Sequence, residues 1–405
     1  MNENRTPHTA ERRIKLLELA STDFTFKMLL GGLLPALKGS GYDLTLACAD
    51  GPYLPEFRKA GYRVKILRVS PNLNIFRHLV SLVQMYQFFK REKFDVIHTH
   101  TPVASFIGRL AAKMARTPLV INTVHGFYFH ENMHPIPRRI IIGLERLAGR
   151  FTDLTFSVSE EDVQSAVRER ICPADRIIAI GNGVDLQEFD PALSEQARKR
   201  IREEFGLPPR AEVVGMVGRI VKEKGFVEFV HSMPRVLEAR PQTRFLMVGD
   251  ALPSDYDSVK EQVVALVTSL RLTDNVVFTG IRLDMPEVLS AMDVLVLPSY
   301  REGMPLVVLE AMAMAKPVVA TRIRGCREVV VDGETGLLVP PRDVTALADA
   351  IVRLLSDKEL ARRMGVAGRK RVEQRFDRNK IIKNQLDALA KLVSPACYET
   401  QAKGD

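Results

Sequence analysis

The stretch from residue 293 to residue 321, "DVLVLPSYREGMPLVVLEAMAMAKPVVAT", carries the pattern that decides the fold. Residues 293–299 form a short apolar run typical of a buried strand, and the polar loop "YREG" follows it. A helix is predicted from Pro305, and "PVVAT" predicts a second strand. A strand, a helix and a strand in this order indicate two parallel strands joined by a crossover helix.

The same alternation runs through most of the chain. A first series closes at "RIIAIGNGVD", a second opens at "VVGMVGRI", and a polar, proline-bearing linker separates them. We therefore predict an α/β protein with two tandem Rossmann-like doubly wound domains that face a cleft. The predicted boundaries are 1–185 for the first domain, 186–211 for the linker and 212–376 for the second domain. Open sheets of this kind bind ligands at the carboxyl ends of their strands, so the chemistry is expected in the cleft.

Composition and charge narrow the class of protein. The chain has 405 residues, 46% of them hydrophobic and 26% charged, which are ordinary globular values. We see no apolar run near the roughly 18 residues that span a bilayer, no secretion signal and no CxxC spacing among the four cysteines. A cytoplasmic protein is expected. The net charge of +9 suits an anionic membrane or an anionic small ligand better than nucleic acid, because the basic residues are spread out without interleaved aromatics.

The loop "GRIVKEKG", residues 218–225, places two cations between a strand and a helix. Arg219 and Lys224 suit a phosphate or diphosphate, which they would bind through charge-assisted hydrogen bonds. A solvated basic turn is the alternative, since Lys and Arg are common on surfaces.

Two glutamates flank the turn before the helix of the opening stretch. The free N–H groups of Leu306 and Val307 would offer partial positive charge to an anionic diphosphate. Glu310, one turn further on, can accept hydrogen bonds from a vicinal diol such as a ribose, and Glu302 lies nearer to whatever the phosphates carry. Each acid alone is better explained as a surface or helix-dipole residue, but the pair in this setting indicates a ligand site.

Three histidines lie near strand ends of the first domain, His98 and His100 in "DVIHTH" and His125 in "TVHG". We expect the first two to point to opposite sides of their strand, which would make the pair a poor metal site. At most one of them then faces the cleft, and we prefer His100 at the last strand position. His125 precedes Gly126 and the aromatic loop "FYFHEN" and is the better functional candidate. A structural role is the common alternative for a lone histidine.

Two acidic motifs have simpler explanations than catalysis. Residues 255–257 have the DxD spacing of a divalent-ion site, but an N-cap at Asp257 or Ser258 is the more common use of such residues. In "SEED", Ser159 and Asp162 match a capping box, and no chemistry is expected of them.

Taken together, these motifs resemble a known family. "GNGVD", "GRIVKEKG", "FTGIRLDMPEVLSAMDVLVLPSYREGMPLVVLEAMAMAKPVVAT" and "VVDGETGLLVPPRD" look like the retaining glycosyltransferases of family 4, and Glu302 and Glu310 match that family's E-x7-E motif. "FDVIHTHTP" and "TVHGFYFHE" resemble members that build bacterial exopolysaccharides and capsules. The resemblance implies the GT-B fold and a nucleotide-sugar donor in the second domain.

The resemblance also implies roles for individual residues. Arg219 and Lys224 would bind the donor diphosphate, Glu310 the ribose, and Glu302 and His125 would approach the donor sugar. The other donor-binding residues that it implies are Gly218, Arg282, Gly303, Met304, Pro305, Leu306 and Val307. No metal or other cofactor is implied, because cations and a helix N-terminus would stabilise the departing diphosphate.

Three features depart from the family pattern. "STDFTFK" replaces a Gly-Gly turn after the first strand, and Gly31 and Gly32 are expected inside a helix without that role. "GDALPSDYD" and "RIRGCRE" replace glycine-rich stretches of the family. On the acceptor side the candidates are His100 and Asp23, and residues 377–405 resemble a closing helix that crosses back onto the first domain.

The expected reaction is transfer of a sugar from a nucleotide diphosphate, with UDP expected first and GDP next, to a hydroxyl of a lipid-linked or growing cell-surface glycan. Front-side attack and double displacement both stay open. Residues 27–38 and 138–150 mix basic and apolar side chains and suit contact with an anionic membrane, as from the inner face of the cell membrane. Ordinary crossover helices have the same composition.

Three other functions are considered. A dinucleotide-dependent oxidoreductase lacks its G-x-G-x-x-G after an early strand. A non-hydrolysing sugar-nucleotide epimerase would share the fold and the donor site but needs no acceptor. A non-catalytic glycan- or lipid-binding module would have no reason to keep Arg219, Lys224, Glu302 and Glu310 together.

Overall fold

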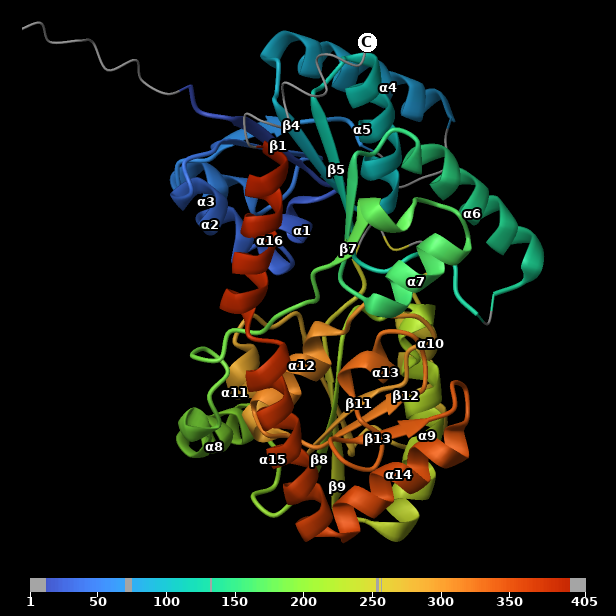
Figure 1. Ribbon diagram of the computed structural model, residues 1–405. Helices are drawn as coiled ribbons and strands as arrows, with labels where there is room; N and C mark the ends of the chain where they lie inside the picture. The colour runs from blue at the N-terminus through green and yellow to red at the C-terminus, as the bar shows by residue number, and fades with distance from the viewer. Residues whose placement is uncertain (1–11, 70–74, 132, 253–254, 256, 394–405) are drawn as a thin grey trace, which may run out of the picture.

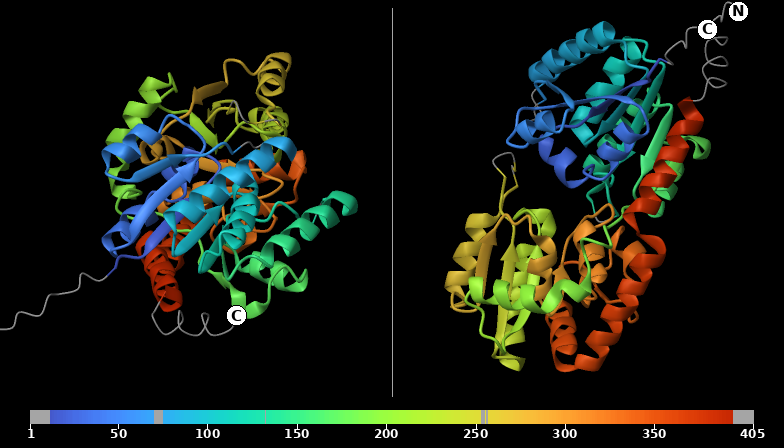
Figure 2. Two further views of the ribbon diagram at one scale, coloured as in Figure 1. Left: turned by 90° about the horizontal axis from the view of Figure 1, so that it is seen from above. Right: turned by 90° about the vertical axis from the view of Figure 1, so that its left-hand side faces the viewer.

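Two α/β domains make up the molecule, one above the other in Figure 1. The computed structural model describes residues 12–69, 75–131, 133–252, 255 and 257–393. The strand pairs that build each sheet run parallel, and helices cover both faces of each sheet, as Figure 2 also shows. The predicted pair of tandem doubly wound domains is therefore confirmed.

The sheet of the first domain has seven strands in the order β3-β2-β1-β4-β5-β6-β7. Its strands are β1 (Lys15–Leu19), β2 (Asp43–Cys48), β3 (Arg63–Ile66), β4 (Val96–His100), β5 (Leu119–Val124), β6 (Leu154–Ser157) and β7 (Ile177–Ala179). The strand order reverses between β1 and β4, and such a switch point is where open sheets of this kind bind ligands.

Helices on both faces bury the apolar side chains of this sheet. They are α1 (Asp23–Met28), α2 (Leu33–Gly39), α3 (Leu54–Lys59), α4 (Ile75–Glu92), α5 (Pro102–Met114), α6 (Pro135–Gly149) and α7 (Glu160–Arg168). Phe88 and Phe89 of α4 pack with Leu17 of β1 on one face, and Phe26 of α1 packs with Leu16 on the other. Successive residues of β1 thus pack into the hydrophobic cores on opposite faces of the sheet.

The two glycines expected inside a helix lie between α1 and α2, so that prediction is wrong. Consecutive glycines weaken a helix because their backbones lose more freedom on ordering. The position also requires a small residue, since a Cβ on Gly32 would lie 2.9 Å from Ile382 Cδ1 and 3.1 Å from Arg378 Nε. The break between α1 and α2 leaves room for the helix that contains Arg378 and Ile382.

The sheet of the second domain has six strands in the order β10-β9-β8-β11-β12-β13. Its strands are β8 (Glu212–Val217), β9 (Thr243–Val248), β10 (Val276–Gly280), β11 (Val294–Leu297), β12 (Val318–Thr321) and β13 (Leu337–Val339). Its helices are α9 (Phe226–Ala239), α10 (Lys260–Ser269), α11 (Met285–Ala291), α12 (Leu306–Ala313), α13 (Cys326–Val329), α14 (Val344–Ser356) and α15 (Lys358–Arg375). Here the order reverses between β8 and β11.

The opening stretch of sequence forms the predicted crossover unit. β11 and β12 pair in parallel, with Leu295 opposite Val318, and α12 connects them. The helix begins at Leu306, and Pro305 is its N-cap rather than its first residue. This is a one-residue difference of the size that helix ends commonly show.

Two segments of chain cross between the domains side by side. Val184 N donates to Phe376 O at 2.9 Å, and Arg378 N donates to Val184 O at 3.1 Å. Beyond this crossing, α16 (Arg378–Val393) packs on α2 of the first domain (Figure 1).

The predicted linker is not extended throughout. It contains α8 (Ser194–Glu204), which packs on α11 of the second domain. Arg198 and Arg202 of α8 bind the two carboxylate oxygens of Asp293 at 2.7 and 2.9 Å.

Candidate functional site

A cavity of about 370 Å³ lies between the domains, near the point where the strand order of the first sheet reverses, and its described lining does not include Arg219, Lys224 or Glu302. From the first domain it is lined by His100 and His125, which stand at the carboxyl ends of β4 and β5. From the second domain it is lined by Leu306 and Glu310 of α12. The cavity thus joins residues that lie almost 200 positions apart in the chain, and it is the cleft that the fold predicts.

Two glycines allow the domains to touch beside this cavity, and a third packs against the same turn within the second domain. A Cβ on Gly126, whose φ is +119°, would lie 2.7 Å from Gly303 Cα, and a Cβ on Gly303 would lie 2.0 Å from the carbonyl oxygen of His125. A Cβ on Gly325 would lie 2.3 Å from the carbonyl oxygen of Gly303. The backbone next to Glu302 is therefore in direct contact with the backbone of His125.

Asn182 adds a second contact at the same turn. Its Nδ2 donates to the carbonyl oxygen of Met304 at 3.0 Å. Asn182 lies in the "GNGVD" turn, and its role at the domain contact was not predicted. A polar residue between two glycines at the end of the first series was the available signal.

Lys224 and Glu302 come together, as the two separate motifs suggest. Lys224 Nζ lies 2.7 Å from Glu302 Oε1, and Ser299 Oγ donates to the same carboxylate at 2.7 Å. Gly225, with φ +81°, ends the lysine turn, and a Cβ there would lie 2.2 Å from the carbonyl oxygen of Pro298. The close approach of the two loops explains why a glycine follows the lysine.

Arg219 is held by acidic neighbours in the same region. It forms an ion pair with Asp255 and lies 4.0 Å from Glu223, which binds Arg301 at 2.7 Å. Gly218 precedes it with an extended backbone and donates its N–H to Val248 O at 2.9 Å. Both cations predicted for a diphosphate therefore already have carboxylate partners.

The DxD motif takes part in this pairing and not in a cap. The carboxylate of Asp255 binds Arg219 and accepts from Leu252 N at 2.8 Å, while Tyr256 lies outside the described residues. α10 begins at Lys260 after Val259, so the expected N-cap at Asp257 or Ser258 is wrong. The cap fails because the helix starts later than the acidic residues.

Glu310 occupies an apolar setting. Burial, with a smaller contribution from the charge of Glu188, raises the pKa of Glu310 to about 7. Its neighbours Leu309 and Ala311 are fully buried in the core of the second domain. A carboxyl group in this position gains from any ligand that donates hydrogen bonds to it.

Two other predicted residues are engaged in the structure. The guanidinium of Arg282 binds Asp284 and Glu204 at 2.6 and 2.5 Å, so its backbone is freer than its side chain to meet a ligand. Asp23 is buried, and its carboxylate accepts from Tyr53 N at 2.6 Å. Asp23 holds a loop of the first domain, and the described lining of the cavity does not include it.

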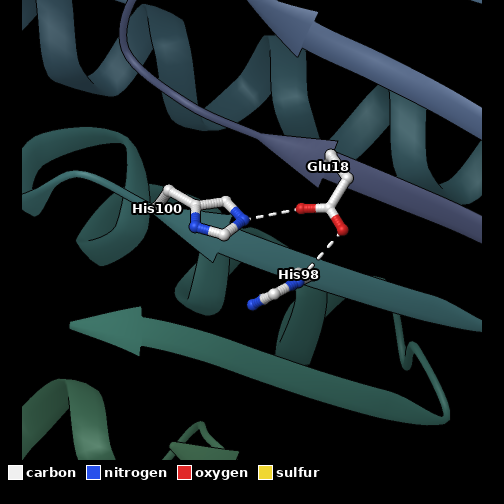
Figure 3. Close-up of side chains that lie close together, drawn as sticks. All are labelled: Glu18, His98 and His100. Atoms are coloured by element: carbon white, nitrogen blue, oxygen red, sulfur yellow. Dashed lines mark hydrogen bonds and ion pairs between the residues drawn. The ribbon is translucent and has the colours of Figure 1, made fainter. Parts of the chain in front are cut away.

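His98 and His100 share one side of β4, contrary to our expectation. Both rings converge on the carboxylate of Glu18 from β1, at 3.0 Å from His98 Nδ1 and 2.6 Å from His100 Nε2 (Figure 3). Residues two apart in a strand point to the same face, and this physical rule overturns the prediction. Glu18, with its side chain fully buried, was missed. A lone acid in the apolar run "IKLLELA" was the signal.

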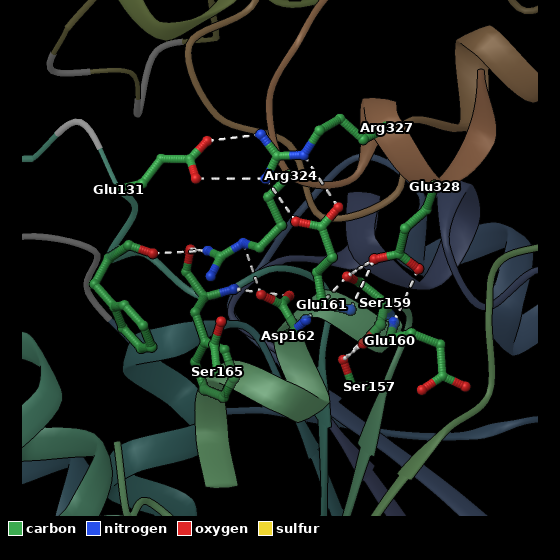
Figure 4. A network of polar contacts seen from close by, with 12 residues as sticks. Glu131, Ser157, Ser159, Glu160, Glu161, Asp162, Ser165, Arg324, Arg327 and Glu328 are labelled. Carbon is green, nitrogen blue, oxygen red and sulfur yellow. Dashed lines mark hydrogen bonds and ion pairs between the residues drawn. The ribbon is translucent and has the colours of Figure 1, made fainter. Parts of the chain in front are cut away.

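A polar network links α7 of the first domain to α13 of the second. Ser159 is the N-cap of α7, as predicted, and accepts from Asp162 N at 3.1 Å. The predicted capping box is otherwise wrong, because Ser159 N donates to Ser157 Oγ and the Asp162 carboxylate binds Arg324 instead. The Ser159 hydroxyl also donates to Glu328 of α13, and Glu160 N and Glu161 N donate to the same carboxylate at 2.9 Å each (Figure 4). A negative charge is stabilised at this end of a helix.

Two arginines of the second domain complete this network, which we call the α7 network. Arg324 Nε lies 2.9 Å from the buried Asp162, and its Nη2 donates to Phe129 O at 2.7 Å. Arg327 binds Glu161 and Glu131 at 2.6 and 2.9 Å (Figure 4). The network holds the two sides of the cleft at a fixed distance near His125.

Comparisons with known proteins agree with this architecture. Residues 30–188 match the family described as "Glycosyltransferase Family 4", and residues 197–371 match "Glycosyl transferases group 1". No helix among the described residues is long and apolar enough to cross a membrane.

Relatives with known names cover most of the chain. An Escherichia coli protein named UDP-Gal:alpha-D-GlcNAc-diphosphoundecaprenol alpha-1,3-galactosyltransferase is 31% identical over 331 residues, which are 80% of this chain and 83% of that protein. The capsular polysaccharide biosynthesis glycosyltransferase CapM of Staphylococcus aureus is 29% identical over 89% of this chain and 93% of its own. The crystal structure of Anabaena HepE with UDP-glucose has a TM-score of 0.80 at 24% identity and covers 94% of this chain and all of its own, which shows a shared fold.

Proposed function

The chain belongs to the family 4, group 1 glycosyltransferases of GT-B fold, and from this premise we propose its substrates and site. The donor is a UDP-sugar, the acceptor is a hydroxyl of a lipid-linked or growing cell-surface glycan, and the sugar keeps its anomeric configuration. The observation that carries the proposal is the placement of Glu302 and Glu310 on either side of the start of α12, with His125 across the junction.

The diphosphate of the donor takes the two cations of the second domain. Arg219 and Lys224 exchange their carboxylate partners, Asp255 and Glu302, for phosphate oxygens, which carry more negative charge per group. The first N–H groups of α12 face the same ligand, as the positive end of a helix favours. These groups stabilise the leaving UDP in place of a metal ion.

The two ends of the donor have different partners. Glu310 accepts hydrogen bonds from the ribose diol, and the backbone near Arg282 lies beside the base. Glu302, once released from Lys224, and His125 contact the transferred sugar, which lies where the two domains touch.

Relatives support the nature of both substrates. The Escherichia coli relative carries UDP-Gal and a diphosphoundecaprenol-linked sugar in its name, and HepE holds UDP-glucose in its crystal structure. We propose the same base and the same class of lipid-linked acceptor for this chain.

An apolar stripe on α6 supports contact with an anionic membrane surface at the cytosolic face. Ile136, Ile140, Leu144 and Leu147 lie on one side of the helix and are between 42% and 64% exposed. Basic residues flank the stripe on the same helix, namely Arg138, Arg139 and Arg146. An exposed apolar stripe with basic edges binds in the headgroup region of a bilayer.

A second exposed apolar stripe lies on α4. On α4, the side chains of Phe76, Leu79, Val80 and Val83 are exposed, and α5 packs between α4 and α6. The other segment that we expected at the membrane, residues 27–38, buries Leu30, Leu33, Leu34 and Leu37 in the core of the first domain. This burial supports the crossover-helix alternative for that segment.

Donor binding is tested by thermal unfolding with UDP, GDP, ADP and NAD. A ligand at 100 times its Kd stabilises the protein by about 2.7 kcal/mol, which is easily measured. We expect UDP to raise Tm for the wild type and for Lys222→Ala, an exposed lysine of the same turn, but not for Lys224→Ala. Stabilisation by NAD alone would contradict the transferase function.

Acceptor use is tested with a UDP-sugar and a synthetic undecaprenyl-diphosphate-linked sugar. Radioactive sugar should enter the organic phase only when both are present. Conversion of the UDP-sugar to an epimer without acceptor would instead favour the epimerase.

A further inference from the structure

A line of buried polar groups runs from the middle of the first sheet to the cavity. Thr123 Oγ1 lies 2.7 Å from His98 Nε2, and His98 Nδ1 lies 3.0 Å from Glu18. On the other side of Glu18, His100 Nε2 lies 2.6 Å from the carboxylate, and His100 Nδ1 lies 3.1 Å from His125 Nε2. Glu18 therefore stands between two branches, and only the branch through His100 reaches His125.

Burial and neighbouring charged groups together define the charge states along the branch through His100. Burial alone would raise the pKa of Glu18, but the neighbouring His98 and His100 lower it to about 2. Burial lowers the pKa of His100 to about 4 and that of His125 to about 3. At neutral pH the branch thus contains a carboxylate and two uncharged imidazoles.

A neutral imidazole has one N–H and one lone pair, so each hydrogen bond in the branch has a direction. The carboxylate of Glu18 can only accept, so His100 donates from Nε2 and has a lone pair on Nδ1. That lone pair needs a donor, and His125 Nε2–H is the group within reach. His125 then has no proton on Nδ1.

We propose that Glu18 is a positioning residue that acts through His100 to fix His125 as the Nε2–H tautomer. The lone pair on His125 Nδ1 then accepts a hydrogen bond from a hydroxyl of the donor sugar. This role rests on the proposed function, in which His125 contacts that sugar. His125 lines the interdomain cavity, and its buried Nδ1 has no hydrogen-bond partner among the described residues.

The unpaired Nδ1 atom of His125 explains why the tautomer of this residue matters. A buried acceptor without a partner is unfavourable in the empty site, and a sugar hydroxyl would satisfy it. The opposite tautomer would present an N–H to the same hydroxyl and would lose its own bond to His100. A fixed tautomer therefore orients the hydroxyl that it binds, and with it the sugar ring.

Glu18, His98 and His100 also have the residue types of a metal site, with one ligand atom of each within 4.8 Å of the others. The hydrogen bonds account for this closeness without an ion, because the two rings approach different oxygens of the carboxylate. The chain of bonds also continues beyond both rings to Thr123 and His125, as expected of imidazoles with one N–H each. A tightly bound metal ion is the competing outcome of the test.

The tautomer can be observed directly in protein labelled with ¹⁵N-histidine. Two-bond ¹⁵N–¹H correlation spectra distinguish a protonated ring nitrogen from an unprotonated one, and His125→Asn assigns the signals. We expect His125 to be protonated on Nε2 in the wild type. Protonation on Nδ1, or a metal ion bound in equal amount to the protein and released with loss of the His98 and His100 signals, would overturn the proposal.

Variants test the direction of the hydrogen bonds between Glu18, His100 and His125. His100→Gln keeps an N–H donor toward Glu18, but its acceptor is an amide oxygen on the same carbon as that N–H and no longer lies at the ring position of Nδ1, so His125 should become a mixture of tautomers. Glu18→Leu should give the same mixture and serves as the second variant. His98→Asn keeps a donor at the Nδ1 position on the other branch and should leave the His125 spectrum as in the wild type. An unchanged His125 spectrum in both His100→Gln and Glu18→Leu would refute the role of Glu18.

Measurements of ligand affinity distinguish a positioning role of the branch from a general structural defect. In His100→Gln, affinity for the UDP-sugar should fall about five- to tenfold, the loss of one oriented hydrogen bond, while affinity for UDP should stay unchanged. A structural defect would weaken both ligands, and that result would contradict a positioning role. If the spectra behave as expected but no sugar is transferred, the branch stands and the proposed function fails.

Discussion

The two domains meet along edges with opposite kinds of polar group. The edge of the second domain has charged side chains in loops, Lys224 with Glu302 and Arg219 with Asp255, which are paired with each other. The edge of the first domain has a neutral imidazole, His125, hydrogen-bonded to the buried His100 of β4. Loop charges can change partners when a ligand arrives, whereas a buried chain of hydrogen bonds keeps one arrangement.

Removal of a charged side chain from the edge of the second domain should have the largest effect, on the rate of sugar transfer. Lys224→Ala should lower kcat/KM about 100- to 1000-fold, the range for removing one group that stabilises developing charge on a leaving group. Initial rates with saturating acceptor measure it, and Lys222→Ala is the control. Equal losses in the two variants would mean that the turn, and not the contact with Glu302, matters.

The next largest effect is expected on stability, from a change in the α7 network that joins the two domains. Glu328→Ala removes the acceptor of Ser159 Oγ and of two N–H groups at the start of α7, and we expect a loss of about 2 kcal/mol in the free energy of unfolding. Urea denaturation measures it. Glu334→Ala changes an exposed acid of the same domain and should have no measurable effect. Similar stability of the two variants would show that the α7 network does not hold the domains.

The ribose partner should make donor binding depend on pH. The pKa of Glu310 in the empty protein is raised to about 7, and a diol that donates hydrogen bonds prefers the carboxylate, so binding below pH 7 must release a proton. The Kd for UDP-glucose should therefore fall by about tenfold per pH unit as pH rises toward 7, and level off above it. Calorimetry between pH 5.5 and 8 measures this, and Glu310→Gln should remove the slope. A wild-type slope that persists in Glu310→Gln would assign it to another group.

The smallest effect is expected far from the cleft. Ile136→Ser combined with Ile140→Ser should weaken binding to vesicles of anionic phospholipid about tenfold, because two apolar side chains no longer enter the bilayer surface. Co-sedimentation measures it. Val366→Ser, an exposed apolar residue of α15, is the control. A loss that is equal in the control would point to general surface effects.

The two edges also differ in how far the sequence could predict them. The tandem fold followed from alternation alone, because each strand is an apolar run and each helix has an apolar face. The charged edge was predictable because loops carry its residues in short motifs such as "GRIVKEKG". The individual roles proposed for these residues stay predictions.

The neutral edge was not predictable in the same way. Glu18, His98 and His100 come from two strands that pair in the sheet, and Glu18 lies directly opposite His98 in the register. Neither the pairing nor its register is visible in a single sequence. Glu328 was missed as a domain contact for a similar reason, since its partners at the start of α7 lie about 170 positions earlier.

The return of α16 to the first domain affects when that domain can fold. Leu389 and Val393 belong to the same core as Leu16 and Phe26, although they are separated from them by the whole second domain. During synthesis on a ribosome, α1 to α3 can cover part of this face of the first sheet, but the part that α16 covers stays exposed until the last helix emerges. The second domain, whose strands and helices are contiguous in sequence, can close first.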